Sequence, residues 1–308
     1  MSKPFPDFDP RLSPPPPPPQ FSQRTSPDGA LTAWLLGIAA VLAVMNVSLL
    51  PVMERSGPDE IRVCWGTFCI GSIGGQAGIL AIAAVLGPSF ALRRHLVVLP
   101  ALAVLAMAWL LGFVISHQNH GYQFPAIRNV IAVMLVLPLM FCVCELPLWF
   151  FRTFLRWRIE SPADGRARPP QLTISGILAA TAAVALALGA VRLGHWLSGS
   201  IDEGEWWLAV AIAAAWCGGI SLLLLPVVTA LVFRTESLAI GLLVSAAWFG
   251  LLCFALFMVL IALFGPPPNT RELHLFVFVG LGFLATLLGP LALCRHFGYR
   301  LHWGRVAG

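Results

Sequence analysis

The stretch LAIGLLVSAAWFGLLCFALFMVLIALF, residues 238–264, runs for 27 residues without one charged side chain. At a rise of about 1.5 Å per residue, an α-helix of this length exceeds the roughly 30 Å hydrocarbon core of a bilayer. Open strands cannot lie in lipid, because their backbone polar groups would stay unpaired, and the stretch shows no period-2 alternation. It therefore predicts a transmembrane α-helix.

Seven further stretches have the same character, and the whole composition agrees with them. Apolar residues make up 58% of the chain and charged residues only 11%, whereas soluble domains are roughly 45–50% apolar and about 25% charged. We therefore expect an all-α, polytopic transmembrane bundle of about eight helices. The other seven are predicted at residues 30–52, 67–87, 96–115, 129–151, 174–193, 206–233 and 275–294.

The segments outside these helices set the domain plan and the orientation. Residues 1–29 contain an unbroken proline run from Pro14 to Pro19 and no apolar signal-peptide core, so we expect a disordered tail. With this tail in the cytoplasm, 14 of the 19 Lys and Arg residues fall on cytoplasmic segments, as the positive-inside rule requires. Both termini are then cytoplasmic, with a basic loop at 152–173 and a short tail at 295–308.

The two halves of the chain resemble each other. QFS at 20–22 and PLMFC at 138–142 have counterparts in QLT at 171–173 and PLALC at 290–294, with offsets of 151 and 152 residues. These matches predict two tandem four-helix units, at 30–151 and 174–294, facing the same way. Chance similarity between Leu- and Ala-rich helices is the alternative.

Two segments also resemble a known group of proteins. PQLTISGILAATAAVALALGAVRL at 170–193 and GGQAGILAIAAVLGP at 74–88 are similar to uncharacterised multi-pass membrane proteins of planctomycete bacteria. The resemblance covers two or three helices and rests on mostly apolar motifs. It implies a location in the bacterial inner (plasma) membrane, and it implies no catalytic or binding residues.

Glu145 is the one acid inside a predicted helix, in CVCELPLWFF. A charge at mid-bilayer costs roughly 2.5–3.5 kcal/mol on insertion scales, so such residues are functional candidates. A structural ion pair with Arg93, Arg94 or Arg295 is one interpretation, and a protonated carboxyl is another. A ligand, proton or metal role is the third.

Gln76 lies among glycines in GSIGGQAG, where the pairs Gly71/Gly75 and Gly74/Gly78 have GxxxG spacing. Small residues at this spacing let a second helix approach closely, and a polar side chain can then form a hydrogen bond across the contact. Helix packing is the favoured interpretation, and contact with a polar substrate is the alternative.

The remaining candidates for chemistry are weaker. His117 and His120 are three residues apart in a predicted outer loop without a third ligand nearby, and Cys142 and Cys144 point apart on a helix. We therefore predict no metal and no cofactor. Cys64 and Cys69 bracket WGTF near the outer surface, where a disulfide is one option.

The sequence contains no convergent catalytic set and no basic cluster interleaved with aromatic residues. An enzyme is therefore the least favoured class, and nucleic acid is not an expected partner. The favoured hypothesis is a structural or interaction protein of the inner membrane, in contact with lipids and with a helix-packing partner or a second copy of itself. The alternative is a transporter of a weakly polar or lipid-like substrate.

Overall fold

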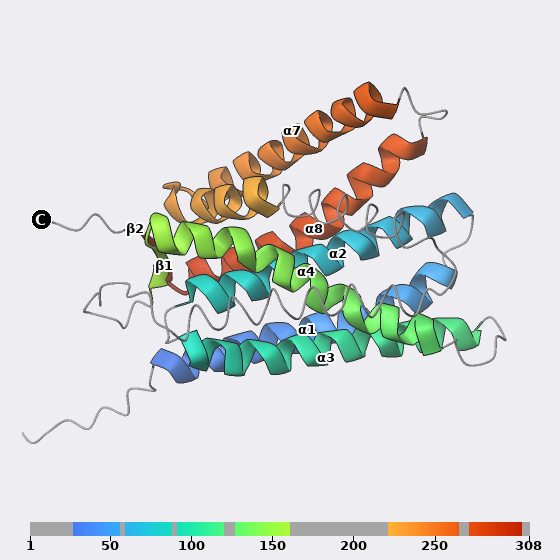
Figure 1. Ribbon diagram of the computed structural model, residues 1–308, viewed down its shortest axis with the longest axis horizontal. Coiled ribbons are helices and arrows are strands. Elements are labelled where there is room, and N and C mark those ends of the chain that lie inside the picture. The colour runs from blue at the N-terminus through green and yellow to red at the C-terminus, as the bar shows by residue number, and fades with distance from the viewer. Residues whose placement is uncertain are drawn as a thin grey trace, which may run out of the picture.

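The computed structural model describes residues 27–55, 59–87, 91–119, 127–160, 221–264 and 271–303. The predicted helix at 174–193, the first part of the one at 206–233, residues 1–26 of the predicted N-terminal tail and residues 304–308 of the predicted C-terminal tail lie outside these ranges. The described elements are α1 (Pro27–Arg55), α2 (Asp59–Leu86), α3 (Ala91–Asn119), α4 (Ile127–Phe154), β1 (Trp157–Glu160), a short helix at Ser221–Arg234, α7 (Leu238–Phe264), α8 (Arg271–His296) and β2 (Arg300–Trp303) (Figure 1).

Six of these helices are long and apolar enough to cross a membrane. The helical character predicted from the composition is therefore confirmed, and the six long apolar helices are compatible with a multi-pass membrane protein. Helix α7 spans the residues that were predicted for it. The α2 helix differs from the prediction, because it begins at Asp59 rather than at residue 67. Charged residues exclude this first part from hydrocarbon but not from a helix that continues into the headgroup region.

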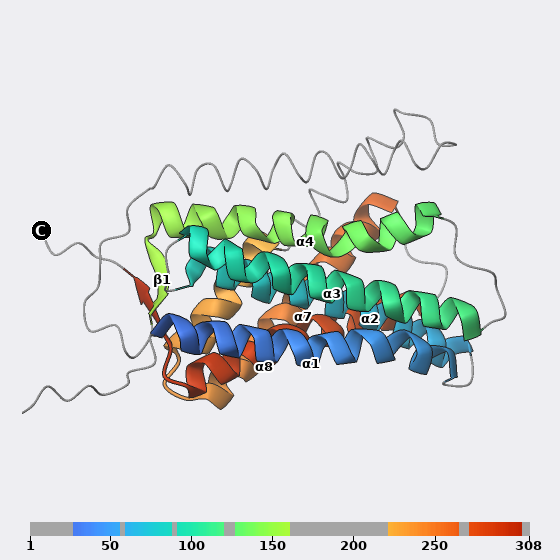
Figure 2. The ribbon, with the colours of Figure 1, turned by 90° about the horizontal axis from the view of Figure 1, so that it is seen from below.

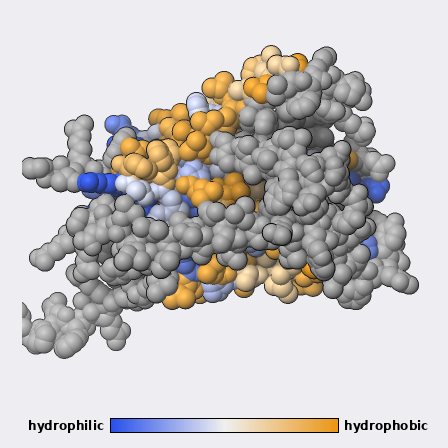
Figure 3. All heavy atoms as spheres, viewed as in Figure 1, coloured by the Kyte–Doolittle hydropathy of each residue, from blue (hydrophilic) through white to orange (hydrophobic). Residues whose placement is uncertain are grey.

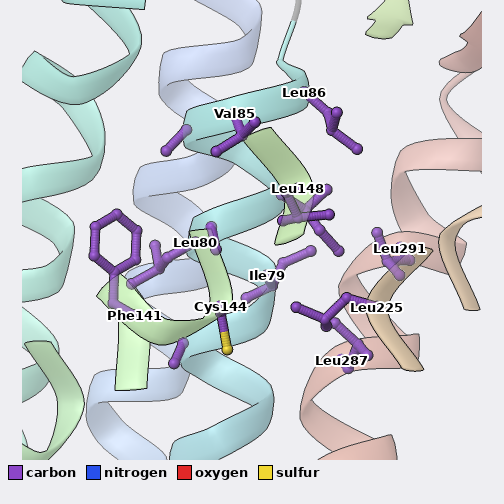
Figure 4. Packing of buried hydrophobic residues seen from close by; sticks show 14 of the residues in the cluster. Ile79, Leu80, Val85, Leu86, Phe141, Cys144, Leu148, Leu225, Leu287 and Leu291 are labelled. Carbon is purple, nitrogen blue, oxygen red and sulfur yellow. The ribbon is translucent and has the colours of Figure 1, made fainter. Parts of the chain in front are cut away.

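The α2 helix lies at the centre of the described bundle. It contacts α1, α3, α4 and α8. Figure 1 shows it between α8 and the α1/α3 pair, and in Figure 2 it lies behind α1 and α3. Its apolar span is 83% buried, whereas the span of α7 is only 17% buried. Figure 4 shows Ile79 and Leu80 of α2 within a core that also holds Phe141 and Leu148 of α4 and Leu287 of α8.

The outer surface of the described helices is apolar, as lipid contact requires. Leu243 on α7 and Val41 and Val44 on α1 are each at least 70% exposed. In Figure 3 hydrophobic residues cover the middle of the described part of one face, and the most hydrophilic ones lie toward its two ends. This distribution matches a hydrocarbon zone between two polar boundaries.

Glycine determines how closely α2 and α8 approach. A Cβ added to Gly75 of α2 would collide with Thr286 and with the carbonyl oxygen of Phe283. From the other side, a Cβ on Gly282 of α8 would collide with the carbonyl oxygen of Phe68. The two backbones are therefore in direct contact, which is the geometry expected of the Gly71/Gly75 pair.

A two-stranded antiparallel sheet, which the all-α prediction did not include, joins the segment after α4 to the segment after α8. Strand β1 pairs with β2 in the register Trp157↔Trp303 to Glu160↔Arg300, so segments that follow α4 and α8 lie side by side. Trp157 and Ile159 are buried, while Arg158 Nη2 forms an ion pair with Glu160 Oε1 at 2.6 Å on the other face. The sequence carried this signal as an alternation in WRIE and RLHW, but four residues are too few to separate a strand from a loop.

Two glycines of α8 provide a matched test of the close approach. Ala exceeds Gly in helix propensity by about 1 kcal/mol, and nothing lies within 4 Å of a Cβ built on Gly289. We therefore expect Gly289→Ala to leave the thermal unfolding temperature in detergent unchanged or slightly raised. Gly282→Ala should lower it, with an overpacking cost of about 1–3 kcal/mol. Equal effects at the two positions would contradict the direct backbone contact.

Candidate functional site

The first buried polar cluster centres on two amide side chains. Asn46 on α1 and Gln76 on α2 are both fully buried and face each other. Asn46 Nδ2 donates to Gln76 Oε1 at 2.8 Å, and Gln76 Nε2 donates to Asn46 Oδ1 at 2.6 Å. Each amide thus uses both its donor and its acceptor on the other, which is the full complementarity that two carboxamides can reach.

Further hydrogen bonds extend this amide cluster to four helices. Asn46 Nδ2 also approaches the carbonyl oxygen of Leu105 on α3 at 3.5 Å, and Gln76 Nε2 donates to Ser72 Oγ at 3.3 Å. From α8, Thr286 Oγ1 donates to the carbonyl oxygen of Ser72 at 3.2 Å. The cluster therefore links α1, α2, α3 and α8 in the most buried part of the bundle.

The position of Gln76 refines its predicted role. Its hydrogen bond crosses a helix contact, as expected, but the partner helix is α1, while Gly71 and Gly75 face α8. Asn46 is the residue that sequence reasoning did not single out as the partner. The sequence offered only a weak signal for Asn46, namely an amide side chain in the middle of an apolar helix.

The second cluster surrounds Glu145, which lies on α4 with 1% of its side chain exposed. Its Oε1 lies 3.3 Å from Nε2 of His95 on α3, whose side chain is 14% exposed. The partners predicted for Glu145 were Arg93, Arg94 or Arg295, so the histidine was missed because its neighbours carry the more obvious charge. The two atoms are within ion-pair distance, but no hydrogen bond joins them.

Arginines next to this pair cap the end of α2. Arg94 Nη1 donates to the carbonyl oxygens of Val85 at 3.0 Å and Gly87 at 2.6 Å, and Arg152 Nη1 also donates to Val85. The last carbonyls of a helix have no partner within the helix and carry the negative end of its dipole. Arg94 also interacts electrostatically with Glu145 and Arg152. The end of α2 therefore accepts hydrogen bonds from both guanidinium groups.

Arg295 has a different partner from the one proposed for it. Its guanidinium donates to the carbonyl oxygens of Val232, Thr235 and Glu236 at the end of the Ser221–Arg234 helix. The same group donates to Thr235 Oγ1 at 3.1 Å. The predicted pairing of Glu145 with Arg295 is therefore wrong, since this guanidinium caps a helix just as Arg94 and Arg152 do.

The other predicted candidates are dispersed. Cys64 and Cys69 are free thiols on one continuous helix, so the disulfide option is wrong. Cys144 Sγ lies 3.5 Å from Ser221 Oγ. His117 is in α3, stacked on Phe113, whereas His120 lies outside the described residues. Within the described ranges, no three His, Cys, Asp or Glu residues come together in a group that could hold a metal.

The amide cluster predicts a stability coupling that can be measured. Gln76→Leu should destabilise the protein by about 1–3 kcal/mol, because it leaves buried Asn46 without its partner. The double variant Asn46→Leu/Gln76→Leu should cost less than the sum of the two single variants, since it leaves neither amide unpaired. Unfolding in detergent, followed by intrinsic fluorescence, gives the three values.

Ser48 supplies the control for this cycle. Its Oγ donates only to carbonyl oxygens of its own helix, Val44 at 2.9 Å and Met45 at 3.1 Å, and it is exposed. Ser48→Ala should therefore change stability by only a few tenths of a kcal/mol. Strict additivity of the Asn46 and Gln76 variants would refute the reciprocal pair.

Comparison with known proteins adds no assignment to these two clusters. No family model, no curated protein and no solved structure matches the chain. The function therefore has to be argued from the geometry of the described residues.

Proposed function

We propose that this protein is a multi-pass membrane protein with a structural or interaction role. The observation that carries the proposal is the use made of the buried amides. Asn46 and Gln76 bind each other across two helices at 2.6 and 2.8 Å, so they serve helix association. A polar substrate site would instead hold amides with donors and acceptors directed toward a ligand.

Most other buried polar groups of the described helices also serve the fold. Thr229 Oγ1 donates to the carbonyl oxygen of Leu225 at 2.6 Å, and Ser245 Oγ donates to that of Gly241 at 2.7 Å. Thr286 connects α8 to α2. Ion and proton pathways are built from chains of ionisable groups facing a bundle interior, and these hydroxyls do not supply such a chain.

The proposal includes eight helices in two tandem four-helix units. Two corresponding contacts support it: Arg152 of α4 caps α2 at Val85, and Arg295 of α8 caps the Ser221–Arg234 helix at Val232. In both units the fourth helix would thus cap the second. These arginines end the segments PLWFFR at 147–152 and PLALCR at 290–295 and are 143 residues apart. This offset is shorter than the 152 of the PLMFC match and the 151 of the QFS match. A short strand follows each of the two helices.

Both termini are proposed to lie in the cytoplasm at a bacterial inner membrane. The support comes from three helix-capping arginines and from the strand pair. Arg94, Arg152, Arg295 and the two strands all lie in or next to the segments assigned to the cytoplasm. The positive-inside rule then decides the side. The planctomycete resemblance supports the choice of membrane.

Transport of a weakly polar or lipid-like substrate is the second candidate. Glu145 and His95 favour it, because a buried carboxylate beside a partly exposed imidazole is a common element of coupled transport. The contact between Cys144 on α4 and Ser221 places this region next to the second proposed unit. Repeat interfaces are where transporter sites usually lie.

Reconstituted protein separates the two candidates. For the structural role, liposomes containing the full chain should pass protons, potassium ions and fluorescent lipid no faster than protein-free liposomes. The chain should also migrate as a complex larger than its 33.2 kDa monomer after mild solubilisation. Protein-dependent flux that Glu145→Gln abolishes, in a variant with unchanged unfolding temperature, would reject the structural role and support transport.

The even helix count has its own test. Epitope tags fused to the two ends should be digested together by protease in inverted membrane vesicles, and both should be protected in right-side-out vesicles. The physical reason is that an even number of crossings returns the chain to its starting face. Digestion of the two tags from opposite faces would rule out eight helices and the proposed orientation together.

A further inference from the structure

One edge of the Arg94 guanidinium has no hydrogen-bond partner among the described residues. Its side chain is only 2% exposed, and its Nη1 serves the carbonyls of Val85 and Gly87. Nε and Nη2, which form the other donor edge, have no hydrogen-bond acceptor among the described residues. A buried donor without an acceptor costs about 1–3 kcal/mol, and more when it is charged.

Nearby, Glu145 has a carboxyl oxygen that lacks a hydrogen-bond donor among the described residues. Its Oε1 is buried and lies at ion-pair distance from His95, yet it accepts no hydrogen bond in the described part of the chain. Arg94 and Glu145 interact electrostatically, but no direct hydrogen bond joins them. Two opposite charges that are close but not in contact, with donors on one and an acceptor on the other, are the usual setting for a bridging molecule.

The hydrogen-bonding groups of Arg94 and Glu145 determine which kind of molecule can bridge them. It must accept from Arg94 N–H groups and donate to a carboxylate oxygen. A simple anion could accept but not donate to Glu145, and a metal cation could not accept from Arg94. Both side chains are almost completely buried, so the bridge must be a very small molecule. Water satisfies all three conditions.

We propose that Arg94 and Glu145 form a binding site for internal water within the apolar bundle. His95, whose side chain is partly exposed while Glu145 is not, forms the entrance from the end of the bundle where α2 ends and α3 begins. The site is independent of whether the protein is structural or a transporter. It differs from the amide cluster, where Asn46 and Gln76 satisfy each other and need no water.

Water-edited solid-state NMR of the full chain in lipid bilayers tests the site directly. Magnetisation from water should reach Nε of Arg94, assigned by its loss in Arg94→Lys, several-fold faster than it reaches the side-chain amide of Gln76. Gln76 is a matched internal control, because it is equally buried but fully paired. Equal build-up at the two nitrogens, or none at Arg94, would overturn the proposal.

Two variants at one position test the contribution of the carboxylate oxygen. Glu145→Gln keeps an acceptor oxygen, so the water signal at Arg94 Nε should persist. Glu145→Leu removes the acceptor and fills the space with methyl groups, so the signal should fall several-fold. Unchanged transfer in Glu145→Leu would contradict a bridge to Glu145. The wild-type comparison with Gln76 remains decisive if this variant does not fold.

Discussion

Hydrocarbon offers no hydrogen-bond partner, so polar groups within these helices depend on other groups of the protein or on internal water. The described bundle meets this constraint in three ways. Hydroxyls such as those of Thr229 and Ser245 bond to carbonyls of their own helix. Asn46 and Gln76 bond to each other between helices. Arginines near the ends bond to the final carbonyls of neighbouring helices. The positions of the polar residues therefore determine which helices can be neighbours.

The α2 helix shows how one sequence serves several neighbours at once. Gly71 and Gly75 let α8 approach to backbone contact, while Gln76, one residue further on, reaches α1. Consecutive residues on a helix point about 100° apart, so adjacent positions face different partners. Packing alone between apolar helices in lipid has little directional preference. The amide pair supplies that direction, because a rotation of α2 would leave both Asn46 and Gln76 unpaired.

The helices were predictable from the sequence, but the partners within the candidate clusters were not. Length and composition determine a spanning helix locally, as residues 238–264 illustrate. That Glu145 meets His95 rather than Arg295 depends on how α3, α4 and α8 are rotated and placed, which no local pattern encodes. The helix-capping role of Arg94 could not be predicted either, because a sequence shows the charge of an arginine but not the helix end that it caps. The strand pair was not predicted for a related reason. Its two strands are far apart in the chain, and each is only four residues long.

The choice of arginine over lysine follows from these contacts. The chain has 18 Arg and a single Lys, Lys3 in the tail, although either residue would satisfy the positive-inside rule. Lysine offers a compact, strongly hydrated point charge, whereas guanidinium is a planar group with five donors and weaker hydration. Arg295 uses that plane to reach three carbonyls and one hydroxyl at the end of a single helix. Charges that orient the chain in the membrane thus also close the ends of its helices, and only the guanidinium has the geometry for both.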